Sequence, residues 1–108
     1  MNLAILFCIT ILALLFSCRK VKCDGSDPSY TADVKTIIDQ NCNSTGCHGA
    51  GSSNGVFVSY LGLKPYLDNG SFKNQVIETR KMPQGAAKLS KDQLQKLQCW
   101  SENGYKEN

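Results

Sequence analysis

The segment QNCNSTGCHGAG, residues 40–51, constrains this chain more than any other part of its sequence. It contains Cys42, Cys47 and His48, and His48 is the only histidine in the 108 residues. Thiol and imidazole groups this close together form a disulfide, bind a metal ion or attach a cofactor. Each of these outcomes fixes the local backbone in a different way, so the rest of the sequence has to distinguish between them.

Residues 1–17, MNLAILFCITILALLFS, have the composition of an export signal. Their apolar run from Leu3 to Phe16 has the length of a signal-peptide hydrophobic region and is shorter than the roughly 20 residues that span a bilayer. The following LFSC resembles the lipobox of bacterial lipoproteins, which implies lipidation of Cys18. We therefore expect an exported, membrane-anchored lipoprotein on the periplasmic side of the cell envelope. The alternative is a signal peptide that is cleaved nearby or retained as an anchor.

Residues 18–108 are lean in apolar side chains for a domain of their size. Without residues 1–17 the hydrophobic share falls from 42% to about one third. A chain this small then needs a cross-link or a cofactor to complete its core. The net charge of +3 lies entirely in this part and is too small to indicate nucleic-acid binding.

An all-α fold is expected, because apolar residues recur at helical spacing and no long stretch alternates as a strand does. The clearest helix begins at Ser90, which with Gln93 forms the pattern of a capping box. Residues 18–29 are polar and aperiodic, so we interpret them as a lipid-anchored linker before a domain at 30–108. The expected helices cover residues 31–41, 59–68, 71–78 and 90–103.

Two cysteines followed directly by a histidine are typical of a c-type haem attachment site. The sulfurs of Cys42 and Cys47 would form thioethers with the haem vinyl groups, and His48 would ligate the iron from one side. The usual spacing is C-x-x-C-H, whereas here four residues separate the cysteines. Gly46 can adopt a positive φ, so the longer insert can loop outward while both sulfurs stay in place.

Met82 is the only methionine beyond the signal, and it lies in the loop RKMPQGAAKLS before the last helix. Methionine fills gaps in many cores, but a lone Met-Pro in a loop is not a typical core position. Methionine is an axial ligand in cytochromes c. With His48 on one side of the iron, no second histidine exists for the other, so Met82 is the predicted distal ligand.

The order of these features resembles a class I, monohaem cytochrome c domain. The resemblance covers about residues 28 to 105. It implies a fold in which the N- and C-terminal helices pack against each other around one covalent haem c, with Trp100 at the helix crossing. The features that carry it are a helix at 31–41, the motif from Cys42 to His48, a variable middle at 49–78, Met82-Pro83, and a helix at 90–103.

The resemblance also implies a function, which is outer-sphere electron transfer with redox proteins as partners. No enzymatic activity and no small-molecule substrate are expected. Basic residues flank the Met82 loop against the single acidic Asp92, and they either steer an acidic partner or form an ordinary solvated face. These basic residues are Arg80, Lys81, Lys88, Lys91 and Lys96.

The remaining cysteines, Cys23 and Cys99, either pair as a disulfide that closes a loop of about 76 residues or stay free.

Three other interpretations of the motif from Cys42 to His48 remain open. A zinc ion could be bound by Cys42, Cys47 and His48 with Cys99. A Cys42–Cys47 disulfide could staple a binding or structural module. A haem sensor would differ from an electron carrier in having a labile Met82 ligand.

Overall fold

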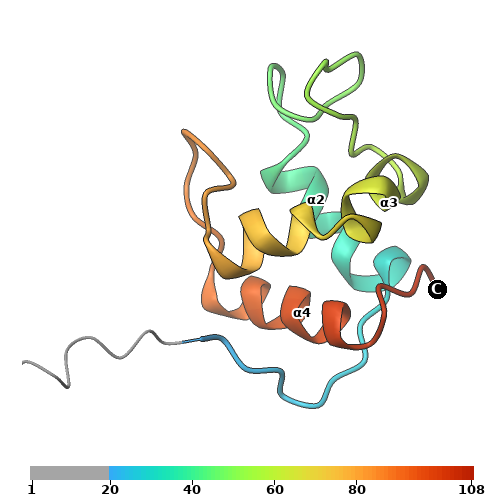
Figure 1. The fold of residues 1–108 in the computed structure, drawn as a ribbon, viewed down its shortest axis with the longest axis vertical. Coiled ribbons are helices and arrows are strands. Elements are labelled where there is room, and N and C mark those ends of the chain that lie inside the picture. Colours follow the sequence, from blue (N-terminus) through green and yellow to red (C-terminus); the bar gives the residue numbers. More distant parts are fainter. Residues whose placement is uncertain (1–19) are drawn as a thin grey trace, which may run out of the picture.

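The computed structural model describes residues 20–108, and all the regular structure in this range is helical. The all-α class expected from the sequence is therefore confirmed for these residues. The predicted signal peptide and Cys18 lie outside them. The elements are η1 (Tyr30–Val34), α2 (Lys35–Asn41), α3 (Tyr60–Asp68), η2 (Lys73–Glu78) and α4 (Lys91–Glu102), where η marks a π-helical segment (Figure 1).

The first predicted helix forms as η1 followed without a break by α2. Ser29 caps it, since its hydroxyl oxygen accepts a hydrogen bond from the N–H of Ala32 at 3.2 Å. At the other end, the N–H of Cys42 donates to the carbonyl of Ile38 at 2.8 Å, which makes Cys42 the C-cap residue. The helix therefore delivers Cys42 directly into the following loop, as the sequence predicted.

The helix that contains Pro65 is more regular than the sequence predicted. Pro65 suggested that the helix at 59–68 starts late or is irregular, because proline lacks the N–H that an interior helical position needs. Instead α3 begins at Tyr60, where the Ser59 hydroxyl caps the Gly62 N–H, and it continues through Pro65 to Asp68. The irregular geometry falls in the next element, η2, which is π-helical.

The N-terminus of α4 is built as the sequence predicted. The Ser90 hydroxyl accepts from the Gln93 N–H at 3.1 Å, and the Gln93 side chain accepts from the Ser90 N–H at 3.0 Å. Both bonds of a capping box are thus present. Leu89 and Leu94, on either side of the cap, are both buried in the core.

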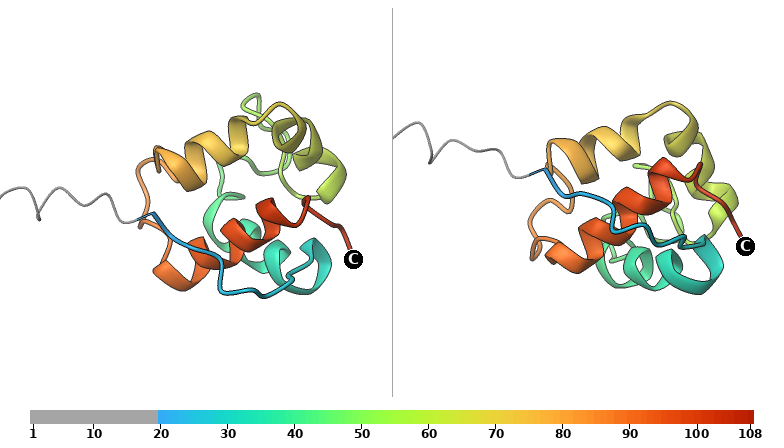
Figure 2. Two further views of the ribbon diagram at one scale, coloured as in Figure 1. Left: turned by 60° about the horizontal axis from the view of Figure 1, so that its bottom comes forward. Right: turned by 90° about the horizontal axis from the view of Figure 1, so that it is seen from below.

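Trp100 is fully buried where α4 meets the other helices. Its ring centroid lies 6.3 Å from that of Tyr30 in η1 and 6.2 Å from that of Phe72, just before η2. Its indole N–H donates to the Lys106 carbonyl at 2.9 Å, so its one polar atom is satisfied. Figure 2 shows α4 between η1 on one side and η2 on the other.

Residues 20–29, which we call the N-terminal strap, run along α4. A disulfide joins Cys23 to Cys99, with the two Cα atoms 4.7 Å apart. The Asn103 side chain donates to the Ser26 carbonyl at 3.1 Å, and Lys106 forms an ion pair with Asp27. The sequence placed this segment in a linker before the domain, whereas its described part is bound to the last helix.

Candidate functional site

Residues 42–58, which we call the cysteine loop, close upon themselves through backbone hydrogen bonds. The N–H of His48 donates to the Cys42 carbonyl at 2.9 Å, and the N–H of Phe57 donates to the His48 carbonyl at 2.8 Å. Gly46 has φ +82°, a backbone conformation that other residues adopt only with strain. The loop therefore joins the backbone of His48 to that of Cys42 across the four residues between the cysteines.

Both cysteines of this loop are free thiols at the edge of the core. Burial raises the pKa of Cys42 from 9.0 to about 11, and the neighbouring Cys47 and Asp39 add smaller contributions in the same direction. Cys42 is therefore a neutral thiol at physiological pH. The Cys42–Cys47 disulfide that the sequence left open is not formed in this structure.

The imidazole of His48 is held in one orientation by two contacts. Its ring stacks on Phe57, with centroids 4.0 Å apart and planes inclined by 2°. Its Nδ1 lies 3.1 Å from the carbonyl oxygen of Gly55. Because a carbonyl only accepts, Nδ1 carries the hydrogen, and Nε2 keeps a lone pair that can ligate a metal ion.

The residues that hold His48 in place were not predicted from the sequence. Phe57 packs edge-on against Tyr66 of α3, with ring centroids 5.0 Å apart. The Gly55 backbone lies so close to the same tyrosine that a Cβ there would be 2.4 Å from its hydroxyl oxygen. Tyr66 thus supports both residues that contact the imidazole. The only sequence feature near these contacts is the short run GVF, residues 55–57.

Met82 lies in a different loop, between η2 and α4. Its N–H donates to the Gln75 carbonyl at 3.0 Å, and its side chain packs against the core. It lines a small pocket of about 50 Å³, and no residue of the cysteine loop lines that pocket. The structure therefore places three of the four predicted ligands on one loop and Met82 on another, and among the described residues Cys42, Cys47 and His48 do not form a group with ligand atoms close enough to hold a metal ion. The other lining residues are Val76, Arg80, Lys88, Leu89 and Leu94.

A wider hollow of about 560 Å³ lies within the cysteine loop and opens to solvent. Cofactor pockets commonly occupy about 300–1,000 Å³. The hollow falls in this range, but none of Cys42, Cys47 and His48 lines it, and the pocket beside Met82 is too small. The sequence suggests six apolar residues around a cofactor, namely Val56, Phe57, Leu61, Leu67, Val76 and Ile77. Four of them are buried in the core, but Val56 is half-buried and Leu61 is 79% exposed. Small or polar residues line the hollow, namely Asn43, Thr45, Gly46, Gly49, Ala50, Gly51, Ser52, Ser53 and Asn54.

The donor set fits a c-type haem in its chemistry. Two free thiols and an imidazole with an available Nε2 lie on one loop, and a thioether lies elsewhere at the core surface. Met82 packs against the buried core, away from the cysteine loop. Met82 and the side chains beside it would therefore have to shift for the thioether to share an iron atom with His48.

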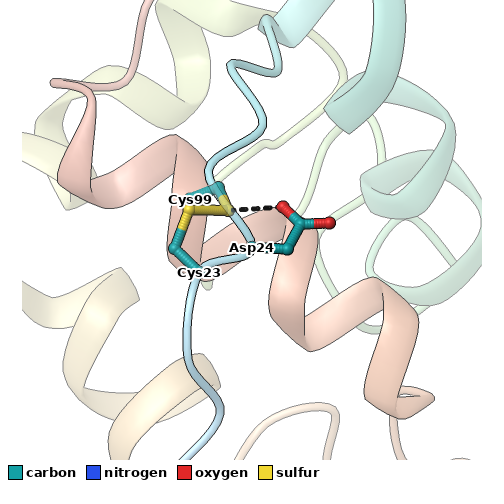
Figure 3. A group of neighbouring side chains, drawn as sticks. All are labelled: Cys23, Asp24 and Cys99. Carbon is teal, nitrogen blue, oxygen red and sulfur yellow. Dashed lines mark hydrogen bonds between the residues drawn. A yellow bond between two sulfur atoms is a disulfide. The ribbon is translucent and has the colours of Figure 1, made fainter.

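A second group of potential ligands consists of Cys23, Asp24 and Cys99 (Figure 3). Because the two sulfurs are joined in a disulfide, neither is a thiolate that could bind a metal ion. Asp24 Oδ1 lies 3.4 Å from the Cys99 sulfur, a contact without a hydrogen. Hydrogen bonds from Ser26 keep the pKa of the Asp24 carboxyl below its usual value. This group is a structural cross-link.

Comparisons with known proteins supply no relative for this site. No family model, curated protein or solved structure matches the chain. Within residues 20–108, no helix combines the length and the apolar character needed to cross a membrane. The site is therefore interpreted from its own residues.

Proposed function

We propose that this protein is a monohaem c-type cytochrome that transfers electrons in the cell envelope. Cys42 and Cys47 would attach one haem c through thioethers, His48 would be the proximal iron ligand and Met82 the distal one. The observation that carries the proposal is the geometry of His48. Its Nδ1–H is committed to the Gly55 carbonyl, so Nε2 is available on the loop that also carries two free thiols.

The chain's own residues would orient and shield the group. Bound haem supplies a one-electron iron couple, and outer-sphere transfer needs no proton donor or nucleophile from the protein. Phe57 and Gly55 keep the imidazole from rotating, which fixes the direction of Nε2. A thioether ligand such as Met82 in apolar surroundings favours a high reduction potential.

A cytochrome c-like fold is part of this proposal. It is supported by the order of the elements and by the contact between η1, at the start of the first helix, and α4, the last one. Trp100 lies at this contact with no exposed surface. In the proposed cellular setting, lipid on Cys18 anchors the protein to an envelope membrane, and other redox proteins are its partners.

Two of the alternative interpretations lose support from the disulfide. Cys99 is bonded to Cys23 and so is not available as the fourth ligand of a zinc ion with Cys42, Cys47 and His48. The cross-link that a lean core requires is also supplied by this pair, which leaves Cys42 and Cys47 for another purpose. A stapled structural module would have no use for them as free thiols.

A haem sensor with a labile distal ligand is the second candidate, and one observation favours it. Met82 lines a pocket that contains no residue of the cysteine loop. A methionine that has to move to reach the iron would also leave it readily. The two candidates share the haem attachment and differ only in whether Met82 stays bound.

Expression in a bacterial host that matures c-type haem tests both parts of the proposal. We expect haem to stay with the polypeptide after denaturation, and this covalent haem to be lost in Cys42→Ala/Cys47→Ala. In Met82→Ala the visible spectrum of the ferric form should lose the features of methionine ligation. Leu89→Ala, which alters the same pocket without removing a ligand, should keep them.

Each possible result of this experiment has a definite meaning. A folded protein without covalent haem would refute the cytochrome proposal. Covalent haem whose spectrum ignores the loss of Met82 would remove this residue as ligand and leave the sensor interpretation in place.

A further inference from the structure

The charges of this protein are distributed unevenly between its two ends. Five lysines form ion pairs with carboxylates, and they are spread over the helices and the C-terminal segment. The five other lysines in residues 20–108 have no ion pair with any described residue, and all are exposed. They come from only two short stretches, the start of the strap and residues 81–91. These lysines are Lys20, Lys22, Lys81, Lys88 and Lys91.

The strap and α4 bring these two stretches together. Lys91, Gln95 and Cys99 are spaced four residues apart, so they form one stripe along α4. Cys99 bonds to Cys23, and the side chain of Gln95 donates to the Lys22 carbonyl at 3.0 Å. The strap therefore runs parallel to α4, and Lys20 lies toward the N-terminal end of the helix, where Lys88 and Lys91 are found. Figure 2 shows the first described residues beside this end of α4.

The same end of the molecule is where the chain leaves for the membrane. Cys18, the expected lipidation site, precedes Lys20 by two residues, and the apolar run from Leu3 to Phe16 ends two residues before Cys18. An extended chain advances at most about 3.5 Å per residue. With lipid on Cys18, Lys20 therefore lies within about one Debye length of the headgroups, roughly 8 Å at physiological ionic strength.

We propose that Lys20, Lys22, Lys81, Lys88 and Lys91 form a membrane-facing surface that binds anionic phospholipid headgroups. The disulfide holds Cys23, five residues after the expected lipidation site, against α4, so the domain cannot turn this surface freely away from the bilayer. Asp92 is the only acidic residue between positions 79 and 96, so little charge opposes the attraction. The inference rests on the membrane attachment in the proposed function and does not depend on haem.

A membrane accounts for these lysines better than an acidic redox protein does. The anchor places the surface next to lipid whether or not a partner is present, whereas a partner would have to enter between the domain and the bilayer. Lys96, which the sequence grouped with the same basic residues, forms an ion pair with Asp33 at 3.9 Å and lies farther along α4. The unpaired lysines are thus confined to the end nearest the anchor.

Lysine acylation on vesicles tests this surface. The full-length protein is reconstituted in vesicles of phosphatidylcholine, alone or mixed with phosphatidylglycerol, and treated with a water-soluble acylating reagent. Mass spectrometry then gives the rate at each lysine. On the anionic vesicles the five surface lysines should react roughly five-fold more slowly, the factor expected for the attraction of one lysine to such a surface. Lys35 and Lys64, which are ion-paired on α2 and α3, are internal controls and should not change.

Two matched variants separate a binding surface from the effect of the tether alone. Lys81→Gln/Lys88→Gln/Lys91→Gln should lose the slowing at Lys22, because the domain is no longer held against the lipid. Lys35→Gln/Lys64→Gln/Lys106→Gln removes the same charge elsewhere and should keep it. Equal rates on both kinds of vesicle, or slowing that survives in both variants, would overturn the proposal. The readout needs no haem, so an absorbance spectrum of each sample shows independently whether the cytochrome proposal holds.

Discussion

The N-terminal strap and the cysteine loop each depend on a pair of cysteines, but the two pairs are used in opposite ways. In the strap, Cys23 is bonded to Cys99, which has no exposed surface on a regular helix. In the cysteine loop, Cys42 and Cys47 remain free thiols among turns and glycines. The first pair joins segments that are 76 residues apart in the sequence, whereas both members of the second pair lie in one short loop.

This difference has an energetic consequence. In the chain-entropy model, a disulfide across 76 residues stabilises the fold by about 4 kcal/mol, whereas one across the short Cys42–Cys47 loop would contribute about 2 kcal/mol. The protein cross-links the pair that gives the greater stabilisation. The other two thiols can remain free for chemistry at a smaller cost in stability.

Removal of the strap disulfide should have the largest effect on stability. The variant Cys23→Ala/Cys99→Ala should lose about 4 kcal/mol in the free energy of unfolding, measured by urea denaturation without reductant. The matched variant Cys42→Ala/Cys47→Ala, in the haem-free chain, should lose about 1 kcal/mol, because it removes only two partly buried thiols. Equal losses in the two variants would show that the cysteine pairs do not differ in this way.

Local sequence patterns predicted the helices well. Ser90 and Gln93 identify the start of α4 because a capping box involves only residues three apart. The first helix and its delivery of Cys42 likewise follow from apolar spacing and a nearby cap. Such features depend on neighbouring residues, which is why a single sequence reveals them.

The position of the strap and the supports of His48 could not be predicted in the same way. The strap is held by bonds between residues more than 70 positions apart, such as Lys22 with Gln95 and Ser26 with Asn103. These bonds follow from tertiary packing and leave no periodic signal. The contact of Tyr66 with Phe57 and Gly55 is of the same kind, and so is the separation of Met82 from the cysteine loop.

The pH dependence of stability should reveal the free thiol of Cys42, because the cross-linked Cys23 and Cys99 do not titrate. The pKa of Cys42 rises from 9.0 to about 11 on folding, so the native state favours the protonated thiol. This contribution is fully present below pH 9 and is lost as the pH approaches 11, because the unfolded chain then releases the proton more readily. In the haem-free chain it should reach about 2 kcal/mol.

Urea denaturation of wild type and Cys42→Ala at several pH values measures this contribution. The wild type should lose more stability than the variant between pH 9 and pH 11. Burial also raises the pKa values of Tyr30 and Tyr105, but both proteins contain these tyrosines, so their effects cancel in the comparison. Identical pH profiles would show that Cys42 is more exposed to solvent than the structure indicates.

The smallest effect concerns one glycine in each region. Gly25 in the strap and Gly46 in the cysteine loop have φ values of +88° and +82°, and a Cβ at either would meet nothing within 4 Å. Alanine at either position should therefore cost only the backbone strain, about 1 kcal/mol, measured by urea denaturation. The two variants should be alike in stability.

They should differ in haem attachment, because only Gly46 lies between the two cysteines that would carry the thioethers. In a host that matures c-type haem, Gly46→Ala should lower the fraction of chains with covalent haem, whereas Gly25→Ala should leave it at the wild-type level. The haem content per chain, from absorbance and protein concentration, measures this fraction. If both variants attach haem as the wild type does, the left-handed turn at Gly46 is not what allows a four-residue insert between the thioethers.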